Sequence, residues 1–318
     1  MKKYINTKKK NYSKKKTKKN LNKNINNKFI SIPSTVATDY FKKQILFFQQ
    51  QHYKIYNNDA INKTIIPIIK YNYFDEKHMS VDKIDWGLTL PYKMVESVYD
   101  LITINNKFDS KIYIPINVFT SAKQIIDSLE DNTLVEIIDA DLVHLKPYPQ
   151  NYHNIKDDEV ITDNFYEKWH MHISTPDSIN RHVINEFLLH NEEGYMNGGF
   201  NVIGKVKTLK KIMNDIILYS IKVTEKMIGI NNHSWWCAMY GLNIACHNNK
   251  IKMINGDNCY YPGINNLQEN HYIAHYSCDK IYDKRNIPNV DIEKFPDNIF
   301  YNAAKEYLET YKSTLIIS

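Results

Sequence analysis

The segment from 121 to 141 limits the possible folds of this chain more than any other part of it. Residues 121 to 130, "SAKQIIDSLE", have the spacing of an amphipathic helix, and residues 133 to 141, "TLVEIIDAD", predict a buried strand ending in two acids. A helix followed by a β-branched strand is typical of folds in which helices connect parallel strands. The segment therefore predicts an α/β fold with Asp139 and Asp141 at the carboxyl end of a strand.

The rest of the body repeats this alternation. Further strands are predicted at 29–33 ("FISIP", ended by Pro33), in "TIIPIIKYN", at 159–165 and 195–205, and in "IKMIN" and "HYIAHYS". Helical spacing occurs in "DYFKKQILFFQQQHYKIY", "TLKKIMNDIILYSIKVTEKMIG" and "SWWCAMYGLNIACHN". We expect a mixed, mostly parallel sheet flanked by helices, formed by one domain over residues 29–318.

The first 28 residues differ from this body in composition. They contain 12 lysines and no acid, and their low complexity predicts a disordered tail. Without them the chain has 29 basic and 35 acidic residues, so the net charge of +6 belongs to the tail. A body that grips nucleic acid is usually basic itself, so we expect no specific nucleic-acid partner. Whether the tail is a polybasic arm or simply a solvated segment stays open at this stage.

Compartment and redox state follow from what the sequence lacks. No apolar run approaches the ~18–20 residues that span a bilayer, and no apolar signal core follows Met1, so we expect a cytoplasmic protein. The four cysteines form no CxxC pair, which predicts free thiols and no structural zinc. Heavy use of Lys, Asn, Ile and Tyr indicates an AT-rich genome, as in some viruses, for which the host cytoplasm or the virion is the expected location.

Asp139 and Asp141 are the strongest candidates for chemistry. Ligands of open α/β sheets bind at the carboxyl ends of the strands. Two carboxylates there could share Mn²⁺ or Mg²⁺, which would also take diphosphate oxygens. The alternative is that both acids cap the following segment or lie solvated at the strand end.

Three other segments carry candidate residues. Asn197, Gly198 and Gly199 in "YMNGGFNVIGK" predict either the wall of a sugar pocket or a tight turn. His275, in a late strand, could be a third metal ligand or a structural histidine. Adjacent Trp235 and Trp236 cannot share a helix face, so one could stack on a sugar while the other packs.

The order of these segments resembles that of glycosyltransferases of the GT-A type, and more narrowly of hydroxyproline arabinosyltransferases and peptidyl-serine galactosyltransferases. The matching stretches span about residues 29 to 285 and are "DYFKKQILFFQQQHYK", "IPINVFTSAKQIIDSLEDNTLVEIIDADLVHLKPYP", "MNGGFNVIGK", "SWWCAMYGLNIACHNNKI" and "YIAHYSCD". The resemblance implies a GT-A, Rossmann-like fold. It also implies transfer of a sugar from a UDP-sugar to a hydroxylated peptide or a glycan, with retention of anomeric configuration.

The resemblance also implies a role for each candidate residue. Asp139, Asp141 and His275 would be the metal ligands, with Asp141, Asn197 and Trp236 as catalytic residues. The nucleotide-sugar would contact Ser34, Thr35, Val36, Asp139, Gly198, Gly199 and Lys280. Trp235, Trp236 and Met239 would lie on the acceptor side.

One departure from the family pattern concerns Ala238. The family usually has a carboxylate there, in "WWCAMY", so this chain needs another group, with Asp163 and His233 as candidates. The departure leaves open a second hypothesis, a catalytically decayed fold that only binds nucleotide-sugar or a partner. A third hypothesis, a nucleic-acid-binding protein, depends on the lysine-rich tail alone.

Overall fold

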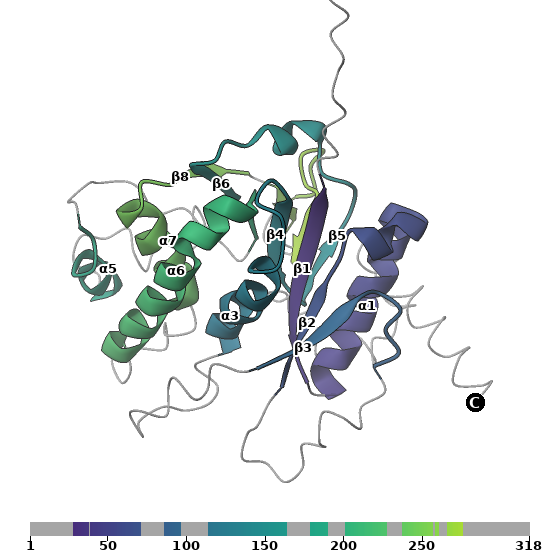
Figure 1. The fold of residues 1–318 in the computed structure, drawn as a ribbon, viewed down its shortest axis with the longest axis horizontal. Coiled ribbons are helices and arrows are strands. Elements are labelled where there is room, and N and C mark those ends of the chain that lie inside the picture. Colours follow the sequence, from purple (N-terminus) through teal and green to yellow (C-terminus); the bar gives the residue numbers. More distant parts are fainter. Residues whose placement is uncertain are drawn as a thin grey trace, which may run out of the picture.

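The computed structural model describes residues 28–37, 39–70, 86–96, 114–163, 179–189, 201–227, 237–256, 258–260 and 266–275. In these parts of the chain a twisted sheet lies between two layers of helices (Figure 1). Helix α1 covers one face of the sheet, whereas α3, α6 and α7 cover the other. The predicted α/β architecture is confirmed.

The main sheet has seven strands in the order β3-β2-β1-β4-β7-β6-β8. Only β7 runs antiparallel to its neighbours β4 and β6, and the other described pairs are parallel. The strands are β1 (Phe29–Val36), β2 (Ile66–Lys70), β3 (Tyr92–Glu96), β4 (Leu134–Asp139), β6 (Glu159–Thr162), β7 (Val202–Lys205) and β8 (Lys252–Asn255).

A second sheet of three short strands follows β4 directly. Its order is β5-β10-β9, where β10 pairs antiparallel with β5 and parallel with β9. The strands are β5 (Leu142–His144), β9 (Cys259–Tyr260) and β10 (Ile273–His275). This small sheet brings a late part of the chain next to the end of β4.

The helices that the apolar spacing predicts are present, apart from some of their ends, whereas the helix at Ile179–Asn185 is not among those predicted. The predicted helix at 121–130 begins earlier and ends earlier, as α3, whose apolar side chains are already buried from Ile116 onward. The helices are α1 (Asp39–Tyr56), α3 (Ile114–Ile126), α5 (Ile179–Asn185), α6 (Val206–Met227) and α7 (Cys237–Asn248), with 3-10 turns η1 (Asn57–Asn62) and η4 (Gln150–Asn154).

The expectation that Pro33 ends the first strand is wrong, because β1 continues to Val36. Ser31 donates its amide to Lys63 O on the β2 side, so the alternate residue Pro33 would direct its missing N–H toward the same side. The β1–β2 pairing is interrupted there, between the Ser31–Thr64 bridge and Thr35. A proline therefore fits inside β1 without the loss of a ladder hydrogen bond.

Helices α6 and α7 pack closely against each other. A Cβ atom at Gly241 would lie 2.6 Å from Ile216 O and 2.6 Å from Ser220 N, so the two backbones approach too closely for any side chain at this position. The apolar stripe of α6 includes Leu209, Ile212 and Ile216, all buried in the main core. In the described parts of the chain, no helix has the length and apolarity needed to cross a membrane.

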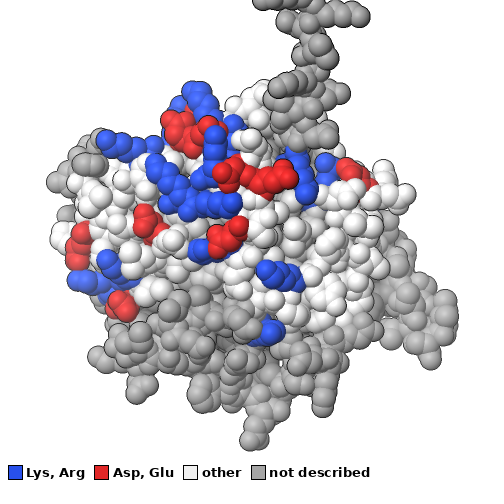
Figure 2. Space-filling model, viewed as in Figure 1, with Lys and Arg blue, Asp and Glu red and all other residues white. Residues whose placement is uncertain are grey.

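The charged side chains on the face shown in Figure 2 are of both signs and interspersed. Asp157 pairs with both Lys205 and Lys207, and Asp131 pairs with Lys210 at 3.0 Å. This face is therefore no uniform basic surface, as the acidic balance of residues 29–318 leads one to expect.

Candidate functional site

Strands β1 and β4 end side by side at one edge of the main sheet. Their parallel register places Ser34 opposite Asp139. Ser34 Oγ lies 2.8 Å from Ser121 Oγ and donates to Val118 O at 3.2 Å, so α3 fixes its hydroxyl. Thr35 and Val36 are also buried, and Val36 packs in an apolar cluster. A nucleotide next to this segment would meet its backbone rather than these three side chains.

Asp139 and Asp141 lie in different surroundings at the end of β4. The Asp139 carboxylate accepts a 2.8 Å hydrogen bond from the amide of Ala140, which is the local capping contact that the alternative hypothesis expects. Asp141, in contrast, is 1% exposed and is therefore not a solvated acid at a strand end. Residues that directly follow it form β5, so the backbone on both sides of Asp141 is held in a sheet.

The small sheet brings His275 to Asp141. Strand β10 pairs with β5 so that His275 lies opposite Leu142, the residue after Asp141. The distance from His275 Nε2 to Asp141 Oδ1 is 3.2 Å, and the imidazole retains 16% exposure. Two of the three predicted metal ligands are thus in direct contact although they are far apart in sequence.

The donor atoms at this edge fit a divalent cation in their chemistry. Carboxylate oxygen and imidazole nitrogen are both ligands for Mn²⁺, whereas Mg²⁺ favours oxygen. Among the described residues, however, no group of three or more His, Cys, Asp or Glu side chains converges as a formed metal site. Asp141 and His275 would hold the ion, and Asp139 would join them only if its carboxylate turned from the Ala140 amide.

Several predicted site residues lie outside the described residues. These are Asn197, Gly198, Gly199, Trp235, Trp236, His233 and Lys280. The free-thiol prediction holds for the three cysteines that are described, Cys237, Cys246 and Cys259, all of which are buried. Burial raises the pKa of the Cys237 and Cys246 thiols to about 12, so neither is a reactive thiolate near neutral pH.

Ala238, where the resemblance leads one to expect a carboxylate, lies inside the main core. Its side chain is fully buried with Leu242 and Ala245 of the same helix. Met239, expected on the acceptor side, is half-buried and packs against this core. Asp163, a candidate substitute for the missing acid, follows β6 and is 3% exposed. The carboxyl end of β6 points to the same edge of the sheet as that of β4, because both run antiparallel to β7.

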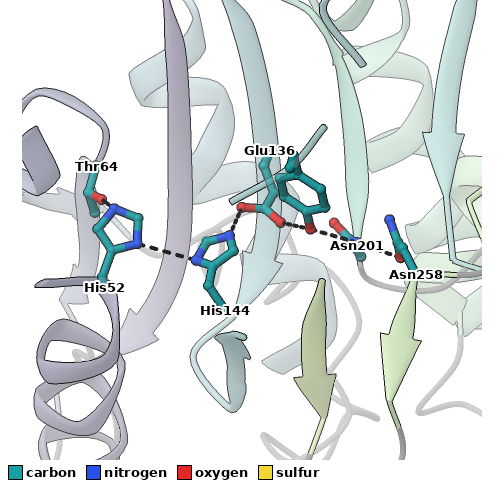
Figure 3. Close-up of polar contacts among 7 residues, drawn as sticks. His52, Thr64, Glu136, His144, Asn201 and Asn258 are labelled. Atoms are coloured by element: carbon teal, nitrogen blue, oxygen red, sulfur yellow. Dashed lines mark hydrogen bonds and ion pairs between the residues drawn. The ribbon is translucent and has the colours of Figure 1, made fainter. Parts of the chain in front are cut away.

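Sequence reasoning missed a chain of buried polar side chains beneath this edge (Figure 3). Glu136 of β4 is its centre. Its carboxylate accepts hydrogen bonds from Tyr148 Oη at 2.5 Å and from His144 Nε2 at 2.8 Å. His144 Nδ1 lies 3.2 Å from His52 Nδ1, and His52 Nε2 contacts the Thr64 hydroxyl.

On its other side the chain continues through two amides. Asn201 Nδ2 donates to Tyr148 Oη at 3.2 Å and to Asn258 Oδ1 at 3.1 Å. Burial, with the nearby Glu136 carboxylate, raises the pKa of Tyr148 well above 10, so its hydroxyl remains a donor. The available signal was Glu136, a charged residue in the middle of an otherwise apolar strand, but its partners come from distant segments.

Comparison with known proteins gives a fold but no sequence family. No family model matches the chain, and no curated protein matches it. Among solved structures, galactosyltransferase LgtC in complex with donor and acceptor sugar analogs superposes with a TM-score of 0.51 at 12% identity, over 87% of this chain and 96% of LgtC. An active-site mutant of LgtC gives a TM-score of 0.52 at 10% identity, over 88% and 96% of the two chains.

The bifunctional glycosyltransferase WbbM gives a TM-score of 0.50 at 11% identity, over 91% of this chain and 53% of WbbM. At this level of identity the likeness concerns the fold alone. The seven-stranded sheet with one reversed strand and its flanking helices is the GT-A fold of these glycosyltransferases.

Proposed function

We propose that this protein is a metal-dependent glycosyltransferase that moves a sugar from a UDP-sugar to a hydroxyl of a protein side chain or a glycan. The observation that carries the proposal is the contact between Asp141 and His275 at the carboxyl edge of a GT-A sheet. Ligands of open α/β sheets bind at that edge. A buried carboxylate beside an imidazole is a donor pair suited to a divalent cation.

Each of these residues has a proposed role. Asp141 and His275 would hold Mn²⁺ or Mg²⁺, with Asp139 as a further carboxylate, and such an ion would neutralise charge on the leaving diphosphate. The backbone around Ser34, Thr35 and Val36 borders the nucleotide. Sheet and helices hold these groups in fixed positions, so much of the rate enhancement comes from orientation of donor and acceptor.

The narrower assignments rest on the sequence resemblance. It favours a hydroxyproline-like or serine-like peptide hydroxyl as acceptor, hexosyl or pentosyl transfer, and retention of configuration. Retention would remove the need for a dedicated protein base, which agrees with an alanine at 238. Asn197, Gly198 and Gly199 would line the donor sugar, Lys280 would contact the donor diphosphate, and Trp236 would contact the acceptor.

The test is release of UDP from a panel of UDP-sugars, with Mn²⁺ or with a chelator. We expect slow, metal-dependent hydrolysis of one donor, and its loss in Asp141→Asn and His275→Ala. The matched control is Asp158→Asn, which makes the same chemical change at an exposed position before β6. Release that persists in Asp141→Asn would refute this assignment of the site.

The second candidate function is a nucleotide-sugar-binding module without catalysis. The observation in its favour is Ala238, where the family's carboxylate is replaced by a side chain buried in the core. Calorimetric titration separates the two. Metal-dependent UDP binding with no release from any donor favours the module, whereas release with any donor favours the enzyme.

A further inference from the structure

The buried polar chain raises the question of what it does, because none of the proposed metal-binding or donor-binding residues belongs to it. Glu136, His144 and His52 have essentially no exposed surface. Aromatic rings enclose them: Phe48 stacks on His52 with centroids 5.2 Å apart, and Tyr148 packs edge-on to His144 at 5.7 Å. A buried carboxylate with two imidazoles is costly to fold unless each polar atom is satisfied.

The chain is connected to the candidate metal site through β5. His144 is the last residue of this strand, and Asp141 immediately precedes the strand. The hydrogen bond from His144 to Glu136 ties β5 to β4 of the main sheet. In the register of the small sheet, His144 lies opposite Ile273 and Leu142 lies opposite His275. The position of His144 therefore fixes where His275 meets Asp141.

The other end of the chain holds β10 as well. The backbone oxygen of Asn258 accepts the amides of Tyr272 at 2.8 Å and of Ile273 at 3.2 Å. The side chain of the same asparagine accepts from Asn201, which in turn donates to Tyr148. Both neighbours of β10 are thus attached to one hydrogen-bonded chain centred on Glu136.

The small sheet needs such an attachment. Its strands have three, two and three residues, and sheets of this size are at best marginally stable alone. A metal site, in contrast, requires its ligands to stay within a few tenths of an ångström of their positions.

We propose that Glu136 and His144 are positioning residues that lock the small sheet onto β4 and so keep Asp141 and His275 together for the cation. The part of this inference that concerns the cation rests on the proposed function, whereas the attachment of the small sheet to β4 does not. Hydrogen exchange therefore tests the attachment separately.

The chemistry of the chain supplies a conservative variant. In Glu136→Gln, the amide oxygen can accept from Tyr148 while the amide nitrogen donates to His144 Nε2. His144 Nδ1 then donates to His52 Nδ1, and His52 Nε2 donates to the Thr64 hydroxyl. Every hydrogen bond of the chain is therefore kept, although donor and acceptor exchange roles in the bonds of the two imidazoles. We expect this variant to keep the small sheet attached to β4. His144→Leu cannot do so, because it leaves the Glu136 carboxylate with one partner fewer.

Two measurements on the full chain test the inference. The first is amide hydrogen exchange followed by residue. In His144→Leu and in the milder Tyr148→Phe we expect faster exchange over 142–145 and 271–275, with β1, β2 and α6 unchanged. Glu136→Gln should resemble wild type. The control is Tyr219→Phe, which removes a hydroxyl bonded at 3.0 Å to Asn248, away from β5 and β10.

The second measurement is the Mn²⁺ concentration that gives half-maximal UDP release. We expect it to rise about tenfold in His144→Leu and severalfold in Tyr148→Phe, with less change at saturating Mn²⁺, since altered support of metal ligands typically costs about 10- to 100-fold in affinity or activity. Glu136→Gln and Tyr219→Phe should leave it unchanged.

The outcomes are distinct. If His144→Leu leaves the exchange rates of the small sheet unchanged, or raises exchange rates equally over the whole chain, the positioning role is overturned whatever the enzyme does. Altered exchange with an unchanged Mn²⁺ requirement would also overturn it. If wild type releases no UDP and binds no Mn²⁺, the proposed function fails, and exchange alone decides whether the chain locks the small sheet.

Discussion

At the scale of single residues, His52 is a titratable group whose pKa is strongly lowered in the folded protein. Burial is the main cause, followed by His144 and Lys63, and together they lower the pKa of His52 from 6.5 to about 2. Tyr56 also faces the ring, with centroids 4.6 Å apart, and the Glu136 carboxylate lies beyond His144. The imidazole is therefore neutral in the folded protein throughout the ordinary pH range.

This perturbation predicts how stability depends on pH. Below about pH 6.5 the unfolded chain protonates this imidazole while the folded chain does not, so the unfolded state binds more protons and stability falls as the pH falls. The contribution is at most about 1.4 kcal/mol per pH unit. Urea unfolding between about pH 7 and pH 4 should therefore show a shallower loss of stability for His52→Gln than for wild type.

The control for this prediction is His182→Gln, at an exposed position of α5. It makes the same chemical change at an exposed histidine outside the buried polar chain, and its slope is the reference for His52→Gln. An identical slope in His52→Gln would mean that His52 takes up a proton in the folded state.

Ala238 shows at the same scale how one residue changes an interpretation. In the sequence, this position stands out only because the resembling glycosyltransferases usually have a carboxylate there. The structure adds that the position is fully buried in the main core, so an acid placed here would be a buried charge rather than a group at the sheet edge. The alanine is thus part of the packed core of the protein.

At the scale of elements, the contact between α6 and α7 depends on Gly241. In Gly241→Ala the new methyl group would overlap Ser220 and approach Ile216 O to 2.6 Å, so the helices must separate. We expect a loss of about 3 kcal/mol in the free energy of unfolding, at the upper end for overpacked cores. Urea denaturation measures it.

Leu218→Ala is the control for this helix pair, since Leu218 lies on the outer face of α6 and is 45% exposed. Its effect should stay within about 0.5 kcal/mol, as for other surface substitutions. A Gly241→Ala protein as stable as wild type would contradict the close approach of the two helices.

Elements also show what the sequence could and could not predict. Helix α1 is predicted over the residues that form it, because its apolar spacing is long and regular. The strand ending in Asp139 and the late strand at His275 are also predicted. Their meeting is implied only by the family resemblance, because the spacing of apolar residues says nothing of how β10 pairs with β5. Strands β5 and β9 are too short to show a pattern.

The buried chain around Glu136 could not be predicted for the same reason. Its members come from α1, β4, β5 and the segments before β2, η4, β7 and β9, and no local signal connects them. Glu136 alone breaks the apolar pattern of its strand, which indicates that a partner exists but not which one.

At the scale of the whole molecule, charge is divided between two parts of the chain. Residues 1–28 carry 12 of the 41 basic residues, whereas the rest carries an acidic excess, and charges of both signs are interspersed on the face shown in Figure 2. Deletion of residues 1–28 should leave UDP release and its metal requirement unchanged. It should abolish any binding to duplex DNA or RNA, which in the full chain should weaken steeply with salt.

Fluorescence titration of a labelled duplex at two salt concentrations, with the full chain and with the protein lacking residues 1–28, measures this binding. Binding that survives the deletion would place a nucleic-acid surface on residues 29–318. A loss of UDP release on deletion would show that the tail contributes to the enzyme.

The pairing of β5 with β10 has a consequence for the order in which the protein becomes functional. Asp141 leaves the ribosome long before His275, so the nascent chain carries half of the candidate cation site once β1 and β4 have been made. Only docking of the late strand β10 joins the two halves. A cation bound by both halves would link the early and late segments of the chain, and it could do so only once β10 has been synthesised and docked.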